Sequence, residues 1–165
     1  MLKDLLILGI DPGSVATGYG IVARRGNRLI FIGAGVVRST KEIGLPLRLD
    51  RIYQGISQVI HDHRPVVAAV EQVFHSTNPR SSLVLGHARG AAILAAVHSG
   101  LEVYEYTPMQ VKQAVVGYGK AEKSQVQQMV KMILGLKRTL AQDASDALAV
   151  AICHANTCKF GDLVR

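Results

Sequence analysis

The chain has few cysteines, few aromatic residues and no long apolar run. Its two cysteines, Cys153 and Cys158, lack the second pair of Cys or His residues that a structural zinc site requires, so we expect them to be reduced and partly buried. No apolar stretch approaches the roughly 18 residues of a membrane-spanning helix. Internal repeats and low-complexity tracts are missing as well. We therefore expect one domain over residues 1–165, with a core large enough to be stable without disulfides or structural metals.

Acidic residues are outnumbered by basic ones. Lys and Arg total 19 against 12 for Asp and Glu, which gives a net charge of +7 and a pI near 9.7. Such an excess suits an anionic partner such as nucleic acid, although a merely soluble basic protein would carry it too. The N-terminal sequence MLKDLLILGIDPG lacks the basic leader, apolar stretch and cleavage site of a secretion signal. The expected location is the cytoplasm.

The hydropathy pattern predicts an α/β fold with a mixed sheet. Helical apolar spacing begins at Leu45 and stops before Pro65, whereas the branched apolar run VVAAVE indicates a short central strand. The predicted strands cover 5–11, 17–25, 28–38, 66–71 and 101–106, and the predicted helices cover 45–64, 81–100, 108–117, 122–136 and 142–158. Three consecutive strands followed by alternating helices and strands predict a mixed five-stranded sheet flanked by helices, not a series of repeated βαβ units.

Two predicted strands each end in a carboxylate. Asp11 follows LLILGI and precedes Pro12-Gly13, and an ordinary turn in which Asp bonds the backbone would explain it equally well. Glu71 ends the run VVAAVE, which is too apolar for a solvated strand. A buried carboxylate costs free energy unless it has a partner. Two buried strands that end in acids therefore suggest a shared site.

The last predicted helix adds two more acids. Asp143 and Asp146 are three residues apart and so are neighbours on one helical face. An acid in the first helical turn also satisfies free N–H groups, which is an alternative role for Asp143. Asp146 is harder to explain as a surface residue, because its own face continues through the apolar residues Ala149, Val150 and Cys153.

Four converging carboxylates would repel one another, and a divalent cation would remove that repulsion. Mg²⁺ prefers carboxylate oxygens, water and substrate phosphates as ligands. Two such ions about 4 Å apart can activate a water and stabilise the leaving oxygen in phosphodiester hydrolysis. Asp11 is therefore predicted to be a metal ligand.

Five ordered sequence blocks carry a resemblance to a known family. GIDPGSVATGYG, VEQVF, LGHARGAAI, PMQVKQAVVGYGKAEKSQV and QDASDALAVAICHA together resemble the bacterial RuvC Holliday junction resolvases over nearly the whole chain. The resemblance implies a ribonuclease H-like fold, a homodimer, Mg²⁺ dependence with Mn²⁺ as the expected substitute, and cooperation with the RuvA–RuvB branch-migration proteins. It implies paired symmetric nicks at four-way junctions in DNA recombination and repair. The acidic tetrad falls on Asp11, Glu71, Asp143 and Asp146.

Further residues are candidates for contact with DNA. Lys112, Lys120 and Lys123 surround a Gly-rich turn and could hold backbone phosphates, although lysines on amphipathic helices are usually just solvated. Phe74 lies three residues after Glu71 in a polar stretch, which favours stacking on a base over a place in the core.

The third block and the segment before it raise two further points. The segment HSTNPRSS departs from the family pattern at Pro79 and Arg80, so its loop shape is open, and Arg80 is a further candidate for DNA contact. Gly86 and Gly90 on an Ala-rich helix would let a second backbone approach. They could pack on the domain's own sheet or form a symmetric dimer contact.

Three other functions are compatible with parts of the pattern. Phosphotransferases and ATPases of the actin and sugar-kinase type also begin with a strand that ends in an acid, but they repeat the fold in two lobes. A related RNA-processing nuclease explains the block QVKQAVVG less well. A non-catalytic nucleic-acid-binding domain accounts for the charge but not for four acids. A Mg²⁺-dependent, structure-selective DNA endonuclease accounts for all of these features.

Overall fold

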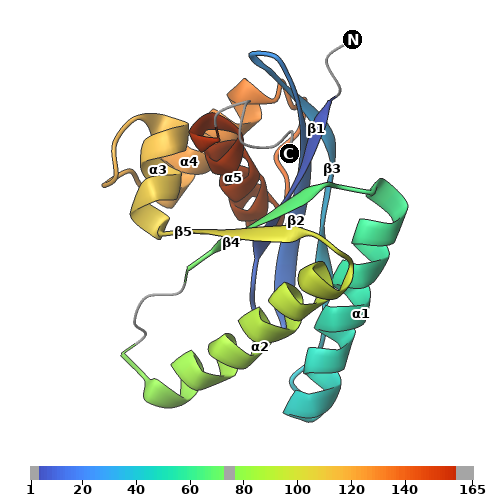
Figure 1. Ribbon diagram of the computed structural model, residues 1–165. Helices are drawn as coiled ribbons and strands as arrows, with labels where there is room; N and C mark the ends of the chain where they lie inside the picture. Colours follow the sequence, from blue (N-terminus) through green and yellow to red (C-terminus); the bar gives the residue numbers. More distant parts are fainter. Residues whose placement is uncertain (1–3, 73–76, 159–165) are drawn as a thin grey trace.

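The computed structural model describes residues 4–72 and 77–158, which form one mixed five-stranded sheet with helices on both faces (Figure 1). The strands are β1 (Leu5–Asp11), β2 (Ala16–Arg25), β3 (Arg28–Arg38), β4 (Val67–Glu71) and β5 (Glu102–Tyr106). The helices are α1 (Leu45–His63), α2 (Pro79–His98), α3 (Pro108–Val116), α4 (Lys123–Ile133) and α5 (Gln142–Thr157). The predicted α/β class and the predicted order of elements are confirmed.

Strand β1 lies at the centre of the sheet, whose order is β3-β2-β1-β4-β5. It pairs antiparallel with β2 and parallel with β4, and β5 extends the parallel part beyond β4. The carboxyl ends of β1 and β4 therefore lie side by side. This arrangement brings the two predicted strand-end acids to one edge of the sheet.

Two of the predicted helices have ends that differ from the structure by two or more residues. The helix expected over 122–136 ends at Ile133, because Gly135 adopts a left-handed conformation with φ of 61°. The helix expected over 81–100 begins earlier, at Pro79, because the Asn78 side chain accepts hydrogen bonds from the backbone N–H groups of Arg80 and Ser81. Pro79 therefore occupies the first helical turn, where its missing N–H has no consequence.

The alternation of side chains divides the core into two layers. Leu8 and Ile10 of β1 face α1 and α2, where they pack with Ile56 and Ala92. The residues that alternate with these, such as Ile7 of β1 and Ala69 of β4, face α5, which is covered in turn by α3 and α4 (Figure 1). Asp11 and Glu71 continue this second set along their strands, so both carboxylates leave the sheet toward α5.

The middle of helix α5 is buried. From residue 144 to residue 155 every side chain is buried except that of Asp146, and both free cysteines lie on or next to this helix. A Cβ atom on Gly9 would collide with the backbone carbonyl of Ala147, and one on Gly20 would lie 2.6 Å from Cγ of Leu148. Glycines on the sheet thus let the helix pack directly on β1 and β2. Within the described residues, none of the helices combines the length and apolar character needed to span a membrane.

Candidate active site

The four predicted acids come from three elements that meet at one end of the sheet. Asp11 is the last residue of β1, and Glu71 is the last residue of the neighbouring parallel strand β4. Asp143 and Asp146 lie in the first two turns of α5, on the face of the sheet toward which Asp11 and Glu71 point. The contact of α5 with β2 sets the distance between these turns and Asp11. Gly18 of β2 pairs with Asp11 and lies beneath the Asp143 carbonyl.

The electrostatics of the site reflect this convergence. The pKa of Asp11 is raised to about 7, with burial as the largest cause and the charges of Glu71, Asp146 and Asp143 acting in the same direction. Burial also raises the pKa of Glu71, with the charge of Asp146 as the next cause. Lys123 opposes both shifts. The acids are therefore close enough to repel one another and too shielded for water to screen that repulsion.

Asp146 has the best-defined surroundings of the four. Its side chain is 18% exposed, accepts a hydrogen bond of 2.7 Å from Nε2 of Gln142, and lies 3.5 Å from Nζ of Lys123. Gln142 is one helical turn earlier, so α5 itself orients the carboxylate. The carboxylate is thus held at the rim of the site rather than in the apolar row below it.

The donor set fits a hard divalent cation. All four side chains offer carboxylate oxygens, and a cation would relieve the repulsion that raises the pKa values of Asp11 and Glu71. Across 4–72 and 77–158, no three Asp, Glu, His or Cys side chains are grouped tightly enough to form a ready-made metal site. Asp146 is turned toward Gln142 and Lys123. Binding of a cation therefore requires side-chain rotation within a backbone that already brings the acids together.

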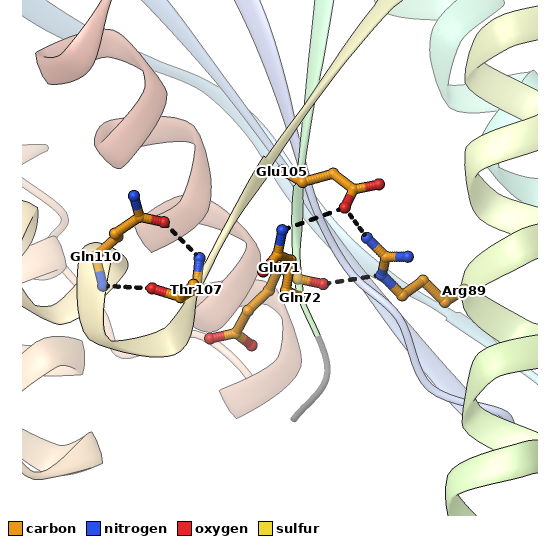
Figure 2. A network of polar contacts seen from close by, with 6 residues as sticks. All are labelled: Glu71, Gln72, Arg89, Glu105, Thr107 and Gln110. Atoms are coloured by element: carbon orange, nitrogen blue, oxygen red, sulfur yellow. Dashed lines mark hydrogen bonds and ion pairs between the residues drawn. The ribbon is translucent and has the colours of Figure 1, made fainter. Parts of the chain in front are cut away.

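Two of the predicted lysines flank the acids. Lys112 and Lys123 line the same recess as Glu71 and Asp146. Lys112 follows the first turn of α3, which a reciprocal pair of hydrogen bonds between Thr107 and Gln110 fixes at its start (Figure 2). Lys123 is the first residue of α4 and is 76% exposed. Both lysine ammonium groups can therefore contact an anion that approaches the carboxylates.

The remaining predicted contacts lie apart from this recess. Lys120 is exposed in the turn between α3 and α4 and is not among the residues that line the recess. Arg80 is exposed in the first turn of α2. Phe74 lies outside the described residues.

Sequence reasoning missed one residue next to the site, Arg89 of α2. Its Nε donates to the backbone carbonyl oxygen of Glu71 at 3.3 Å, and its Nη2 lies 2.9 Å from Oε2 of Glu105 on β5 (Figure 2). The available signal was a single Arg within the mostly small and apolar run ARGAAILAA, because a charge on such a helix needs a partner. The sequence did not show that the partner would be the strand that carries Glu71.

Comparison with known proteins identifies the class. The architecture is that of the ribonuclease H-like proteins, and a solved structure described as Thermus thermophilus RuvC in complex with a Holliday junction substrate matches it with a TM-score of 0.89. That match has 38% sequence identity and covers 95% of this chain and 96% of the other. The yeast mitochondrial Holliday junction resolvase Ydc2 shares the fold, with a TM-score of 0.66 at 18% identity over 91% of this chain and 77% of that one.

The sequence places the chain within one family of this class. The model of the crossover junction endodeoxyribonuclease RuvC matches residues 7–154. The RuvC crossover junction endodeoxyribonuclease of Geobacter sp. strain M21 is 55% identical over 161 residues, which are 98% of each chain. The chain therefore belongs to the RuvC family of crossover junction endodeoxyribonucleases, a family of metal-dependent nucleases. The family, the fold and the enzyme class predicted from the sequence are confirmed, and the three alternative functions are not supported.

Proposed function

We propose that this chain resolves four-way DNA junctions by paired symmetric nicks, with Asp11, Glu71, Asp143 and Asp146 as ligands of two Mg²⁺ ions. The convergence of four carboxylates from β1, β4 and α5 is the observation that carries the proposal. The Thermus thermophilus relative, whose structure is described as a complex with a Holliday junction substrate, supports the choice of substrate. Mn²⁺, which accepts the same oxygen ligands, is expected to substitute for Mg²⁺.

Three of the four acids can be assigned to two sides of the proposed site. When bound, the two cations supply an activated water and stabilise the leaving oxygen of the cleaved phosphodiester. Asp11 and Glu71 sit at the inner, more shielded side, where burial and neighbouring negative charge raise their pKa values and a cation would relieve the repulsion. Asp146 lies at the rim beside Lys123, within reach of an incoming phosphate. Lys112 and Lys123 offset the charge of that phosphate.

Contacts farther along the DNA are part of the same proposal. Lys120 and Arg80 are exposed and are expected to meet backbone phosphates on either side of the recess. Phe74 is expected to stack on a base that is unpaired at the crossover, because every base offers a face to an aromatic ring. Both roles are predictions from the sequence.

A homodimer is also part of the proposal, because two symmetric nicks require two sites. A groove between α1 and α2 offers a contact surface. Gly86 and Gly90 line it and have open space where a Cβ would be, so the alternative that they pack on the domain's own sheet is wrong. Leu83 and Leu94, also in the groove, are 64% and 51% exposed. A second copy seated here would bury these leucines against their symmetry mates.

The cellular setting follows the family resemblance. We expect the RuvA–RuvB complex to deliver junctions to the dimer, a single nuclease domain over residues 1–165 to carry the activity, and the cytoplasm to be its location.

A direct assay separates the proposed substrate from its competitors. The protein is incubated with Mg²⁺ and with a labelled four-way junction, a linear duplex of the same sequence, a structured RNA, and ATP. We expect symmetric nicks in the junction alone, and none when EDTA replaces Mg²⁺. Cleavage of the linear duplex or of the RNA at a similar rate would contradict junction selectivity.

A further inference from the structure

Arg89 crosses the end of the sheet from the side opposite the active site. It extends from α2, on the α1–α2 face, and reaches the last residue of β4 (Figure 2). The carboxylate of Glu71 points away from Arg89, toward α5, while the backbone carbonyl of the same residue accepts from Nε of Arg89 at 3.3 Å. Arg89 thus touches the backbone of a proposed metal ligand without entering the site itself.

Glu105 holds the guanidinium in place. Its Oε2 lies 2.9 Å from Nη2 of Arg89 and also accepts from Nε2 of Gln72 at 3.3 Å. The Arg89 side chain is only 20% exposed, and its Nη2 atom is shielded from water. The planar guanidinium can therefore bind a carbonyl and a carboxylate at once with little freedom to rotate.

The end of β4 needs such support. Its pairing with β1 ends at Val70, one residue before Glu71, whereas its pairing with β5 continues to the pair Glu71 and Tyr106. Beyond that pair, the backbone N–H of Gln72 donates to the Tyr106 carbonyl at 2.7 Å. Glu71 is thus tied to the sheet on the β5 side only, and Arg89 supplies a contact from another layer.

We propose that Arg89, oriented by Glu105, is a positioning residue that fixes the backbone of Glu71 and thereby sets where its carboxylate meets the other acids. The inference rests on the proposed function, because it assigns Glu71 to the metal site. Groups that orient metal ligands commonly change metal affinity by about 10–100-fold when they are removed. The same contact links the site to α2, whose Gly86 and Gly90 line the proposed dimer groove.

A purely structural role makes a different prediction. The Arg89–Glu105 pair joins α2 to β5, and Glu105 is 42% exposed, so solvent weakens the contribution of their attraction to folding. If the pair served only to join these elements, its loss would lower the melting temperature and leave the metal affinity of the folded protein unchanged. If it positions Glu71, metal affinity falls in protein that is still folded.

Binding of Mn²⁺ to the DNA-free protein, measured by titration calorimetry, distinguishes the two roles. We expect Arg89→Gln to weaken Mn²⁺ binding about tenfold and to raise the Mg²⁺ concentration for half-maximal cleavage by a similar factor. The rate at saturating Mg²⁺ and the affinity for a junction in EDTA should change much less. Arg51→Gln, which removes the same charge from an exposed position on α1, is the matched control and should leave Mn²⁺ binding unchanged.

Further variants of Glu105 and Arg89 test whether Glu105 acts on Glu71 through Arg89. Glu105→Gln leaves the guanidinium in place but removes the charge that orients it, so we expect a smaller loss of Mn²⁺ affinity. The double variant Arg89→Gln with Glu105→Gln should be no weaker than Arg89→Gln alone, because Glu105 acts through Arg89. Arg89→Lys keeps the charge without the forked geometry and should recover the melting temperature more fully than the Mn²⁺ affinity.

The possible outcomes distinguish failure of the positioning role of Arg89 from failure of the proposed function. A folded Arg89→Gln protein that binds Mn²⁺ as tightly as the wild type overturns the positioning role. Should Arg89→Gln fail to fold, unchanged Mn²⁺ affinity in Glu105→Gln and Arg89→Lys overturns it equally. A wild-type protein that neither binds Mn²⁺ nor cuts a junction would instead overturn the proposed function.

Discussion

The α-carbon of Gly18 lies directly beneath the backbone carbonyl of Asp143, so closely that no side chain fits between them. Gly18 is also the residue that pairs with Asp11 across the β1–β2 ladder. One glycine therefore sets the spacing between the sheet that carries Asp11 and the helix that carries Asp143. The position of α5 in the site depends on this absence of a Cβ.

Substitution of Gly18 by Ala should displace the first turn of α5. The added methyl would meet backbone rather than a flexible side chain, so we expect a loss of about 1–3 kcal/mol in the free energy of unfolding. We also expect weaker Mn²⁺ binding in the folded fraction. Urea denaturation and calorimetry measure the two effects. Gly44→Ala, where the new Cβ meets only Cδ of Pro46 at 3.7 Å, is the control. Wild-type stability in Gly18→Ala would show that α5 adjusts freely.

Much of this site is predictable from the sequence, for reasons that individual residues make clear. Asp11 and Glu71 end apolar strands, so local hydropathy alone marks them as acids that are shielded from water, and both are partly buried in the structure. Asp146 interrupts a helix of small apolar residues, and it is the one side chain between residues 144 and 155 that is not buried. These signals depend only on near neighbours in the chain.

Gly18 and Arg89 show why the rest is not predictable in this way. The value of Gly18 lies in its contact with a helix more than 100 residues later, and a missing side chain carries no periodic signal. Arg89 contacts a strand in another layer through a hydrogen bond to the backbone carbonyl of Glu71. A backbone carbonyl is present at every residue, so the sequence cannot indicate which one accepts the bond. The helix start at Pro79 differs from the expected start for a local reason, because the cap provided by Asn78 lets the proline occupy the first helical turn.

Asp146→Asn should nearly abolish cleavage without loss of the fold. The amide keeps the shape of the side chain and can still contact Gln142, but it removes one negative charge from the proposed metal site. We expect the rate of nicking to fall by about 100-fold or more, while junction binding persists or strengthens because less negative charge faces the DNA. Gel-shift and single-turnover assays measure the two quantities.

The control for this substitution is Asp62→Asn, which makes the same change at an exposed position on α1. Its cleavage rate should match that of the wild type. Cleavage by Asp146→Asn at a rate near that of the wild type would remove Asp146 from the ligand set.

Lys112→Ala and Lys123→Ala should act on the DNA rather than on the metal. Both side chains line the recess beside Glu71 and Asp146, so each is expected to neutralise one backbone phosphate. Each substitution should flatten the dependence of junction affinity on salt by about one unit of log–log slope, with the Mg²⁺ requirement preserved. Lys41→Ala, at an exposed turn position, should leave the slope as it is. An unchanged slope in Lys112→Ala or Lys123→Ala would mean that the lysine is only solvated.

The acid sensitivity of folding should depend on His154, which is buried behind the site. Its Nδ1 lies 2.8 Å from the Tyr106 hydroxyl, and its Nε2 lies 3.2 Å from Sγ of Cys158. Burial lowers the pKa of His154 to about 4 from an ordinary value of 6.5. The folded protein therefore keeps this imidazole neutral over a pH range in which the unfolded chain binds a proton. Stability contributed by the neutral ring is complete above pH 6.5 and is lost as the pH falls toward 4.

The size of the effect follows from that difference in pKa. Between pH 6.5 and pH 4 the loss should approach about 3 kcal/mol at most, since one pKa unit corresponds to about 1.4 kcal/mol. Urea denaturation of metal-free protein at several pH values measures it, as the difference between wild type and His154→Phe. Asp11, whose raised pKa acts in the opposite direction, contributes to both proteins and cancels. His61→Gln, at an exposed position on α1, is the control and should follow the wild-type curve. Parallel curves for the wild type and His154→Phe would show that His154 takes up its proton in the folded state as readily as in the unfolded chain.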